Sequence, residues 1–278
     1  MDARDFADRT MTEHDEVSLP LCRRLCALLD LDPAVVVAGA ELPLAWSSVL
    51  FPSIARQGGI GPDGHARRGD FLPDVGLPRR RFAGRQVELS TPLRIGDALT
   101  RRSTIADVTE KTGRNGPMVF VTIRHEVSSA GKAAYVERQR VVYLGPETTG
   151  ASPRADGGKP EPRAADWERT VTFDPVMLFR YSALTFNGHR IHYDREYAVR
   201  EEGYAGLVVN GGLTTLSLLE MARDRLGGQI TGYAMRARKV LLADRPVRLC
   251  GAATEAGAAL WALDLDGDVA VEIDVTTV

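Results

Sequence analysis

The chain has 278 residues, which suits one large domain or two domains of ordinary size. It is 44% hydrophobic and 26% charged, as is typical of globular proteins, and 35 basic against 37 acidic residues give a formal net charge of −2. This balance indicates neither a nucleic-acid partner nor binding to a membrane surface.

Cysteine usage and the N-terminal residues bear on the cellular compartment. Cys22, Cys26 and Cys250 form no pair of CxxC motifs, so no metal site is expected, and an odd, low cysteine count is typical of a reducing compartment. Residues 1–6 are polar and mixed in charge, unlike a signal peptide, and no apolar run is long enough to span a bilayer. We therefore expect a cytoplasmic protein without a membrane partner.

The N-terminal part divides into a helical and an irregular segment. Residues 1–30 are predicted to be helical, with capping residues in 12–16 and four leucines of 21–29 on one face. Residues 46–80 are rich in Gly and Pro and lack a period. So long a segment without regular structure is more often a functional loop than a simple connection.

From residue 82 the apolar period changes to two, which predicts strands. The predicted strands form an antiparallel meander over residues 82–89, 99–109, 118–128 and 133–144, with turns at 113–116 and 129–132. Residues 146–166 contain several Pro and Gly without periodicity and are interpreted as a linker.

A second series of elements follows the linker. We predict strands over 167–173, 233–242, 247–254, 258–264 and 269–278, with one helix starting at Asp174-Pro175 and another over 212–226. Helix, loop and strands thus occur twice, an α+β plan with residues 1–145 and 167–278 as its two halves.

The segment from Arg180 to Asp194 contains the strongest functional signal. Two of the five histidines, His189 and His192, lie there with Asn187, and a Gly-rich turn at 208–213 that opens a helix follows shortly after. The segment therefore combines a candidate acid/base with a candidate oxyanion site. This combination suits chemistry on a carbonyl or thioester.

Residues 186–194 (FNGHRIHYD) and 202–211 (EGYAGLVVNG) together resemble the MaoC-like hot-dog dehydratases. More narrowly, with residues 61–65 (GPDGH), 69–73 (GDFLP) and 77–80 (LPRR), the chain is similar to the mesaconyl-C4-CoA hydratase branch, which includes mitochondrial 3-hydroxyacyl-thioester dehydratases. The resemblance implies a double hot-dog, in which each half wraps a sheet around a central helix. The C-terminal half would carry the hydratase motif, and the N-terminal half would shape the pocket for the acyl or CoA part.

Hydratases of this superfamily use the pattern D-x-N-P-x-H, in which an Asp and a His transfer protons. On this chain the His is His192, the Asp position is Asn187, and the Asn falls on His189. Because an amide cannot accept a proton at neutral pH, we expect His192 to be the general base and Asn187 to orient the water. His189 is a candidate second acid/base, or a residue that holds His192 in place.

The resemblance also suggests how the substrate is bound. The thioester oxygen gains negative charge during hydration, and the N–H of Gly211 at a helix start is the expected donor, with Gly212 as the alternative. A distal carboxylate needs a cation, because burying it unpaired is costly. The unranked candidates for this cation are Arg190, Arg79, Arg80, Arg81 and Arg180.

Several of these residues also have purely structural interpretations. Asn187 is suited to an Asx turn or helix cap, and Asp194 is expected to cap a helix over 195–201. Basic residues such as Arg79–Arg81 often form a solvated edge. The remaining histidines, His14, His65 and His125, are expected at the surface.

The predicted function is reversible hydration of a short branched dicarboxylyl enoyl-CoA, itaconyl-CoA or mesaconyl-C4-CoA, to citramalyl-CoA, without a cofactor. Three alternatives stay open: a 3-hydroxyacyl-thioester dehydratase of fatty-acid type, a hot-dog thioesterase, and a non-catalytic acyl-CoA-binding module. The Asn at position 187 speaks against the thioesterase, which would need a carboxylate. A homodimer is expected because hot-dog sheets often associate edge to edge.

Overall fold

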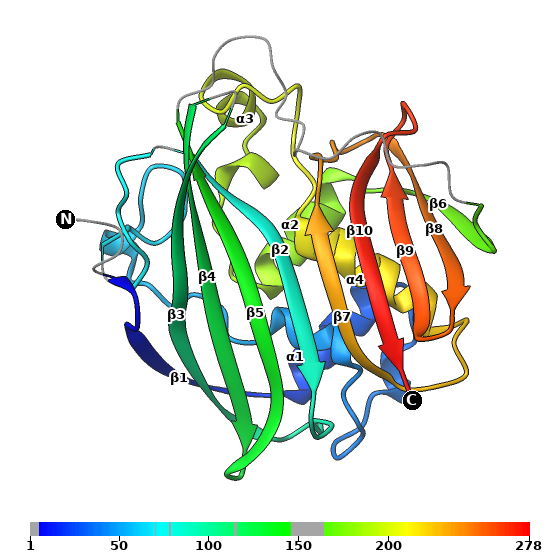
Figure 1. Cartoon of the computed structure of the whole chain (residues 1–278). Coiled ribbons are helices and arrows are strands. Elements are labelled where there is room, and N and C mark those ends of the chain that lie inside the picture. The colour runs from blue at the N-terminus through cyan, green and yellow to red at the C-terminus, as the bar shows by residue number, and fades with distance from the viewer. Residues whose placement is uncertain (1–5, 70, 78, 114–115, 146–163) are drawn as a thin grey trace.

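A computed structural model describes residues 6–69, 71–77, 79–113, 116–145 and 164–278. Within these residues a ten-stranded antiparallel sheet curves in front of the helices (Figure 1). Its strands are β1 (Thr10–Glu16), β2 (Arg79–Leu89), β3 (Ala98–Gly113), β4 (Gly116–Ser129), β5 (Lys132–Leu144), β6 (Trp167–Thr172), β7 (Ile230–Ala237), β8 (Pro246–Thr254), β9 (Gly257–Leu263) and β10 (Val269–Thr277).

The order of the strands shows an internal repeat. Across the sheet they run β1-β3-β4-β5-β2 and then β7-β10-β9-β8-β6. Each half therefore places its first strand at the outer edge and its second strand at the centre, where β2 and β7 pair from Gly84↔Arg236 to Glu88↔Gly232. The predicted linker lies mostly within residues 146–163, outside the described residues, so the domain boundaries stay a prediction.

The helices are short and lie on the concave side of the sheet, except α3 at its upper rim (Figure 1). The α-helices are α1 (Leu19–Leu28), α2 (Pro175–Leu184), α3 (Arg195–Arg200) and α4 (Gly211–Arg223). The 3₁₀ segments are η2 (Pro33–Val35), η3 (Leu44–Val49), η4 (Gln57–Gly59) and η5 (Arg190–His192).

The prediction of helix over residues 1–30 is wrong for residues 10–16 and leaves residues 1–5 outside the described residues. Residues 10–16 form β1, which pairs along its whole length with β3, and the helix starts only at Leu19, after Ser18 caps it through a bond from the Leu21 N–H. The exposure of residues 10–16 alternates, as an edge strand requires. Most of its residues are polar on both faces, so the strand has no apolar periodicity by which it could be predicted.

The four strands predicted over residues 82–144 exist, but they are not one meander. Strands β3, β4 and β5 follow one another, whereas β2 pairs with β5 instead of β3. In the second half the observed elements lie near the predicted ones. Asp174 caps the start of α2 by accepting the Met177 N–H.

The core lies between the sheet and the helices. Helix α4 is the most deeply buried helix, because its leucines at 213, 216, 218 and 219 are at most 1% exposed. Removing such side chains from water stabilises the fold by about 1.5–3 kcal/mol each. Of the described helices, none is long and apolar enough to cross a membrane.

Candidate active site

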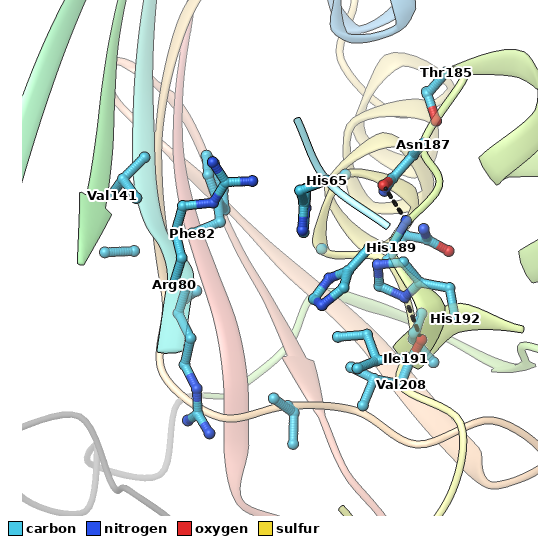
Figure 2. A pocket seen from close by; sticks show the side chains of 18 of the residues that line it. His65, Arg80, Phe82, Val141, Thr185, Asn187, His189, Ile191, His192 and Val208 are labelled. Atoms are coloured by element: carbon cyan, nitrogen blue, oxygen red, sulfur yellow. Dashed lines mark hydrogen bonds between the residues drawn. The ribbon is translucent and has the colours of Figure 1, made fainter. Parts of the chain in front are cut away.

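An open cleft with a volume of about 2220 Å³ is lined by residues of both halves. Figure 2 shows part of it, with His65, His189 and His192 grouped opposite Arg80 and Phe82 of β2. The start of α4 at Gly211 also lines the cleft. The cleft therefore contains the predicted base and the predicted oxyanion donor together.

His192 has the geometry of a neutral general base. Its Nδ1 lies 2.7 Å from the carbonyl oxygen of Val208, so Nδ1–H is the donor and the lone pair is on Nε2. The side chain is buried, and burial, with the nearby His189 and His65, lowers its pKa from 6.5 to about 3. His192 is therefore uncharged at neutral pH and able to accept a proton.

Local packing holds His192 in this orientation. The N–H of Val208 donates to the carbonyl of Ile191 at 3.0 Å, and its carbonyl accepts from the His192 ring. Val208 is therefore bonded to both His192 and the residue before it. Ile191, Val208 and Ala198 of α3 form a small buried cluster beneath η5. These contacts determine the tautomer and position of the ring before substrate binds.

Asn187 adopts the structural role that its sequence allowed. Its Oδ1 accepts the backbone N–H of His189 at 3.1 Å, which makes an Asx turn, and Phe186 before it has a positive φ of 48°. Because the backbone N–H of His189 must face Oδ1, the other end of the amide is the Nδ2 group, which is a donor. This group cannot accept a hydrogen from water.

His189 lies between two other imidazoles. Its ring centroid is 4.1 Å from that of His65 and 5.5 Å from that of His192, the second pair being edge to face. Its Nε2 lies 3.9 Å from a carboxylate oxygen of Glu202, whose pKa is lowered by His189. His189 therefore belongs to the site, and its contacts are with His65 and Glu202 as well as with His192.

The prediction that His65 is exposed is wrong. The side chain is 27% exposed, its ring contacts that of His189 at an angle of 48°, and its Nδ1 lies 3.2 Å from Oδ2 of Asp63. Burial lowers the pKa of His65 to about 4, although Asp63 acts in the opposite direction. Burial would raise the pKa of Asp63, but the bonds from the His65 ring and backbone outweigh it and hold that pKa below its usual range.

A glycine–glycine contact brings this loop of the N-terminal half to the histidine motif. A Cβ on Gly64, which has φ +89°, would lie 1.8 Å from the carbonyl oxygen of Gly188, and one on Gly188 would lie 2.7 Å from that of Gly64. The N–H of Arg190 also donates to the carbonyl of Asp63 at 2.9 Å. In the sequence this loop is marked by the GPDGH motif, but the motif does not predict that the loop contacts Gly188.

The two glycines at the start of α4 have different surroundings. A Cβ on Gly212 would meet the hydroxyl oxygen of Tyr181 at 2.2 Å, whereas one on Gly211 would meet only Phe82, at 3.9 Å. Gly212 thus permits close packing of α4 on Tyr181, while Gly211 faces the cleft. At a helix start the first N–H groups have no intrahelical acceptor, which leaves the Gly211 N–H for a ligand.

The candidate arginines occupy different places. Arg190 is paired with Asp194 at 2.7 Å and stacks on Tyr197, and it does not line the cleft. Arg180 is exposed on α2. The three candidate arginines on β2 do line the cleft: Arg79 donates to the carbonyl of Gly145, Arg81 lies over the Tyr204 ring, and Arg80 faces the histidines (Figure 2).

The remaining predictions have mixed outcomes. Asp194 caps α3 through the Tyr197 N–H at 3.0 Å, as predicted, and His14 is exposed. His125 was expected at the surface but is buried, because it lies between Ser103 and Gln139 in neighbouring strands. Both ring nitrogens of His125 have polar partners on neighbouring strands, and the sequence alone does not show this pairing.

One group of side chains offers metal-ligating atoms. Atoms of Asp63, His65 and His189 lie within 4.8 Å of one another. The bond between Asp63 and His65 already uses one atom of each residue. The hydrogen bond between Asp63 and His65 therefore accounts for their approach without a metal.

The chain is similar to several known proteins. A family model described as hydroxyacyl-thioester dehydratase type 2 matches residues 45–243. Mesaconyl-C(4)-CoA hydratase of Chloroflexus aurantiacus is 40% identical over 240 residues, 86% of this chain and 85% of that protein.

Solved structures of low identity share the fold. HtdX of Mycobacterium tuberculosis is similar with a TM-score of 0.69 at 18% identity, over 97% of this chain and 100% of HtdX. Another protein of that organism, described as having a double hot-dog fold, matches with a TM-score of 0.58 at 13% identity, over 98% of this chain and 96% of its own. The predicted double hot-dog is therefore confirmed.

Proposed function

Because the chain belongs to the hydroxyacyl-thioester dehydratase type 2 family and is a hydro-lyase, we propose that it hydrates a short branched dicarboxylyl enoyl-CoA. The substrate is mesaconyl-C4-CoA or itaconyl-CoA, and the product is citramalyl-CoA. The observation that carries the chemistry is the uncharged His192, with Nε2 as its acceptor, in the cleft into which α4 begins. The name of the Chloroflexus relative supports the substrate class.

In mesaconyl-C4-CoA, whose double bond is conjugated with the thioester, His192 takes a proton from water as the water oxygen bonds to the β-carbon. The electrons of the double bond move toward the thioester carbonyl, whose oxygen gains negative charge. The Gly211 N–H and the positive end of α4 stabilise this oxygen. His192 then returns its proton to the α-carbon, which completes the addition and restores the neutral imidazole.

Among the candidate arginines, Arg80 is the proposed partner of the distal carboxylate. It lines the cleft opposite the histidines, whereas Arg190 is paired with Asp194 and Arg180 is exposed. Its burial lowers its pKa, and pairing with a carboxylate would offset that cost. Replacing Arg80 with Gln should therefore lower kcat/KM for mesaconyl-C4-CoA by about 100-fold and for crotonyl-CoA by less than about threefold.

Arg180→Gln on α2 is the matched control and should leave both values near those of the wild type. Equal losses on the two substrates in Arg80→Gln would count against its contact with the distal carboxylate.

The function is tested by following the enoyl-thioester absorbance with crotonyl-CoA, mesaconyl-C4-CoA and itaconyl-CoA, and free thiol in parallel. Loss of absorbance with the dicarboxylyl substrates and no thiol release supports the proposal. Preference for crotonyl-CoA or longer enoyl thioesters would favour a dehydratase of fatty-acid type. Thiol release would identify a thioesterase, and binding without turnover a non-catalytic module.

Location and assembly are further parts of the proposal. A cytoplasmic location is consistent with Cys22, Cys26 and Cys250, which are all buried free thiols. A homodimer would be formed through the outer edges of the sheet, where β1 and β6 each pair on one side among the described strands. Light scattering of the purified protein distinguishes the dimer from a monomer of 30.3 kDa.

A further inference from the structure

The proposed hydration calls for a second hydrogen acceptor beside His192. A water attacking a β-carbon is aligned best when both of its hydrogens are accepted, one by the base and one by a second group. His192 provides the first acceptor. The amide of Asn187 is already engaged, because its oxygen accepts the His189 N–H, and its amide nitrogen only donates.

The loop of the N-terminal half provides an acceptor of the required kind. The ring of His65 lies 4.1 Å from that of His189, centroid to centroid, and His189 is itself in edge-to-face contact with His192. His65 donates its Nδ1–H to Asp63, so its lone pair is on Nε2, as it is in His192. All three rings line the same cleft and lie together in Figure 2.

We propose that His65 is a catalytic residue of the hydratase, whose Nε2 accepts the second hydrogen of the attacking water, and that Asp63 is its positioning residue. This inference rests on the proposed function. Only the proton taken by His192 moves to the α-carbon. The hydrogen held by His65 stays on the oxygen and becomes that of the product hydroxyl, so His65 begins and ends neutral.

The charged groups around His65 agree with this role. Asp63 fixes the tautomer, while Arg80 across the cleft and His189 beside the ring both disfavour a charged imidazole. Glu202 lies on the other side of His189. His65 is thus kept uncharged, as an acceptor must be, although Asp63 is beside it.

The test compares His65→Leu, His65→Gln and Asp63→Asn with His14→Gln, an exposed histidine away from the cleft. His65→Leu removes the acceptor and should lower kcat by about 100-fold with KM changed by less than about threefold. His65→Gln keeps an oxygen acceptor and should lose about tenfold. Asp63→Asn should also lose about tenfold, because the tautomer is no longer fixed. His14→Gln should retain wild-type kcat.

The outcomes separate the inference from the function on which it rests. A wild type that turns over while His65→Leu stays within threefold of it would overturn the inference and leave the hydratase intact. Equal losses in the Leu and Gln variants, with lowered melting temperatures, would assign His65 a structural role and also overturn it. So would loss of wild-type activity on chelation that zinc restores. No turnover by the wild type on any enoyl-CoA would overturn both.

Discussion

The two halves share one strand order but differ in what lies between their first and second strands. In the C-terminal half, α2 is followed by η5, α3 and the 13-residue α4, which begins at Gly211 in the cleft. In the N-terminal half, α1 is followed by η3, a 3₁₀ segment of six residues that begins after Pro43 and packs against α4. Within the described residues it is therefore the C-terminal half that presents a full α-helix start, with its unpaired N–H groups, to the cleft.

The N-terminal half has a long irregular segment after η3, whereas in the C-terminal half α4 leads to β7 within a few residues. Residues 50–69, which follow η3, reach the histidine motif and place Asp63 and His65 beside His189. The two halves of a duplicated sheet can thus contribute different residues to the same cleft. One half holds the proposed base and the helix start, and a loop of the other half reaches the same cleft.

Replacing His192 with Ala tests this division most severely. The base is lost, so kcat should fall by about 1,000-fold, within the range of general acid–base catalysis. The measurement is hydration of mesaconyl-C4-CoA, with binding of the CoA ester followed by calorimetry. Retained turnover in the variant would place the base elsewhere, and the N-terminal half would be the first place to search.

Replacing Gly64 with Ala should separate the two halves at the site. A methyl group there meets the Gly188 carbonyl oxygen at 1.8 Å, so the loop must move away and His65 with it. We expect kcat to fall about tenfold to 100-fold, and the positive φ alone costs about 1–3 kcal/mol of stability.

Gly76→Ala is the matched control for this change. Gly76 also has a positive φ, +69°, but a Cβ there meets nothing within 4 Å. It should show the stability cost without the loss of kcat. Equal kcat in the two variants would mean that docking of the loop on Gly188 is not needed for catalysis.

The helix start is tested by a pair of substitutions. Gly211→Ala meets only Phe82 and should fold normally, but its methyl group crowds the approach of the thioester, so kcat/KM should fall about tenfold. Gly212→Ala strikes the Tyr181 hydroxyl and should lower the melting temperature instead. The reverse pattern would identify Gly212 as the residue that faces the substrate.

The pH dependence should be the mildest effect. Because the pKa of His192 is about 3 in the folded protein, kcat/KM should stay within about twofold from pH 8 to about pH 5. An inflection near pH 6.5 would show that a histidine with an ordinary pKa controls the rate.

Stability has a definite sign over the same range. The unfolded chain protonates His192 and His65 below about pH 6.5, whereas the folded chain does not until pH 3–4. The unfolded state therefore binds more protons there, so the free energy of unfolding falls as pH falls through this window. Denaturant titrations at pH 7.5 and pH 5 measure it.

Local patterns in the sequence were enough for most of the fold. The apolar alternation of β3, β4 and β5 and the Asp174-Pro175 start of α2 are interactions between near neighbours, so they can be read along the chain. Strand β1 was missed because its residues are polar on both faces, and only pairing with β3 makes it a strand. The pairing of β2 with β5 instead of β3 is likewise a contact between distant segments, which no local pattern specifies.

The sequence by itself determined the kind of chemistry in this protein, because the spacing of Asn187, His189 and His192 and the Gly211 turn are local features. Only the tertiary structure decided which groups complete the site. The tautomer of His192 depends on Val208, and the presence of Asp63 and His65 depends on the contact of Gly64 with Gly188. These are contacts between segments distant in the chain, and burial, which lowers the pKa of both His192 and His65, exists only once those segments have packed.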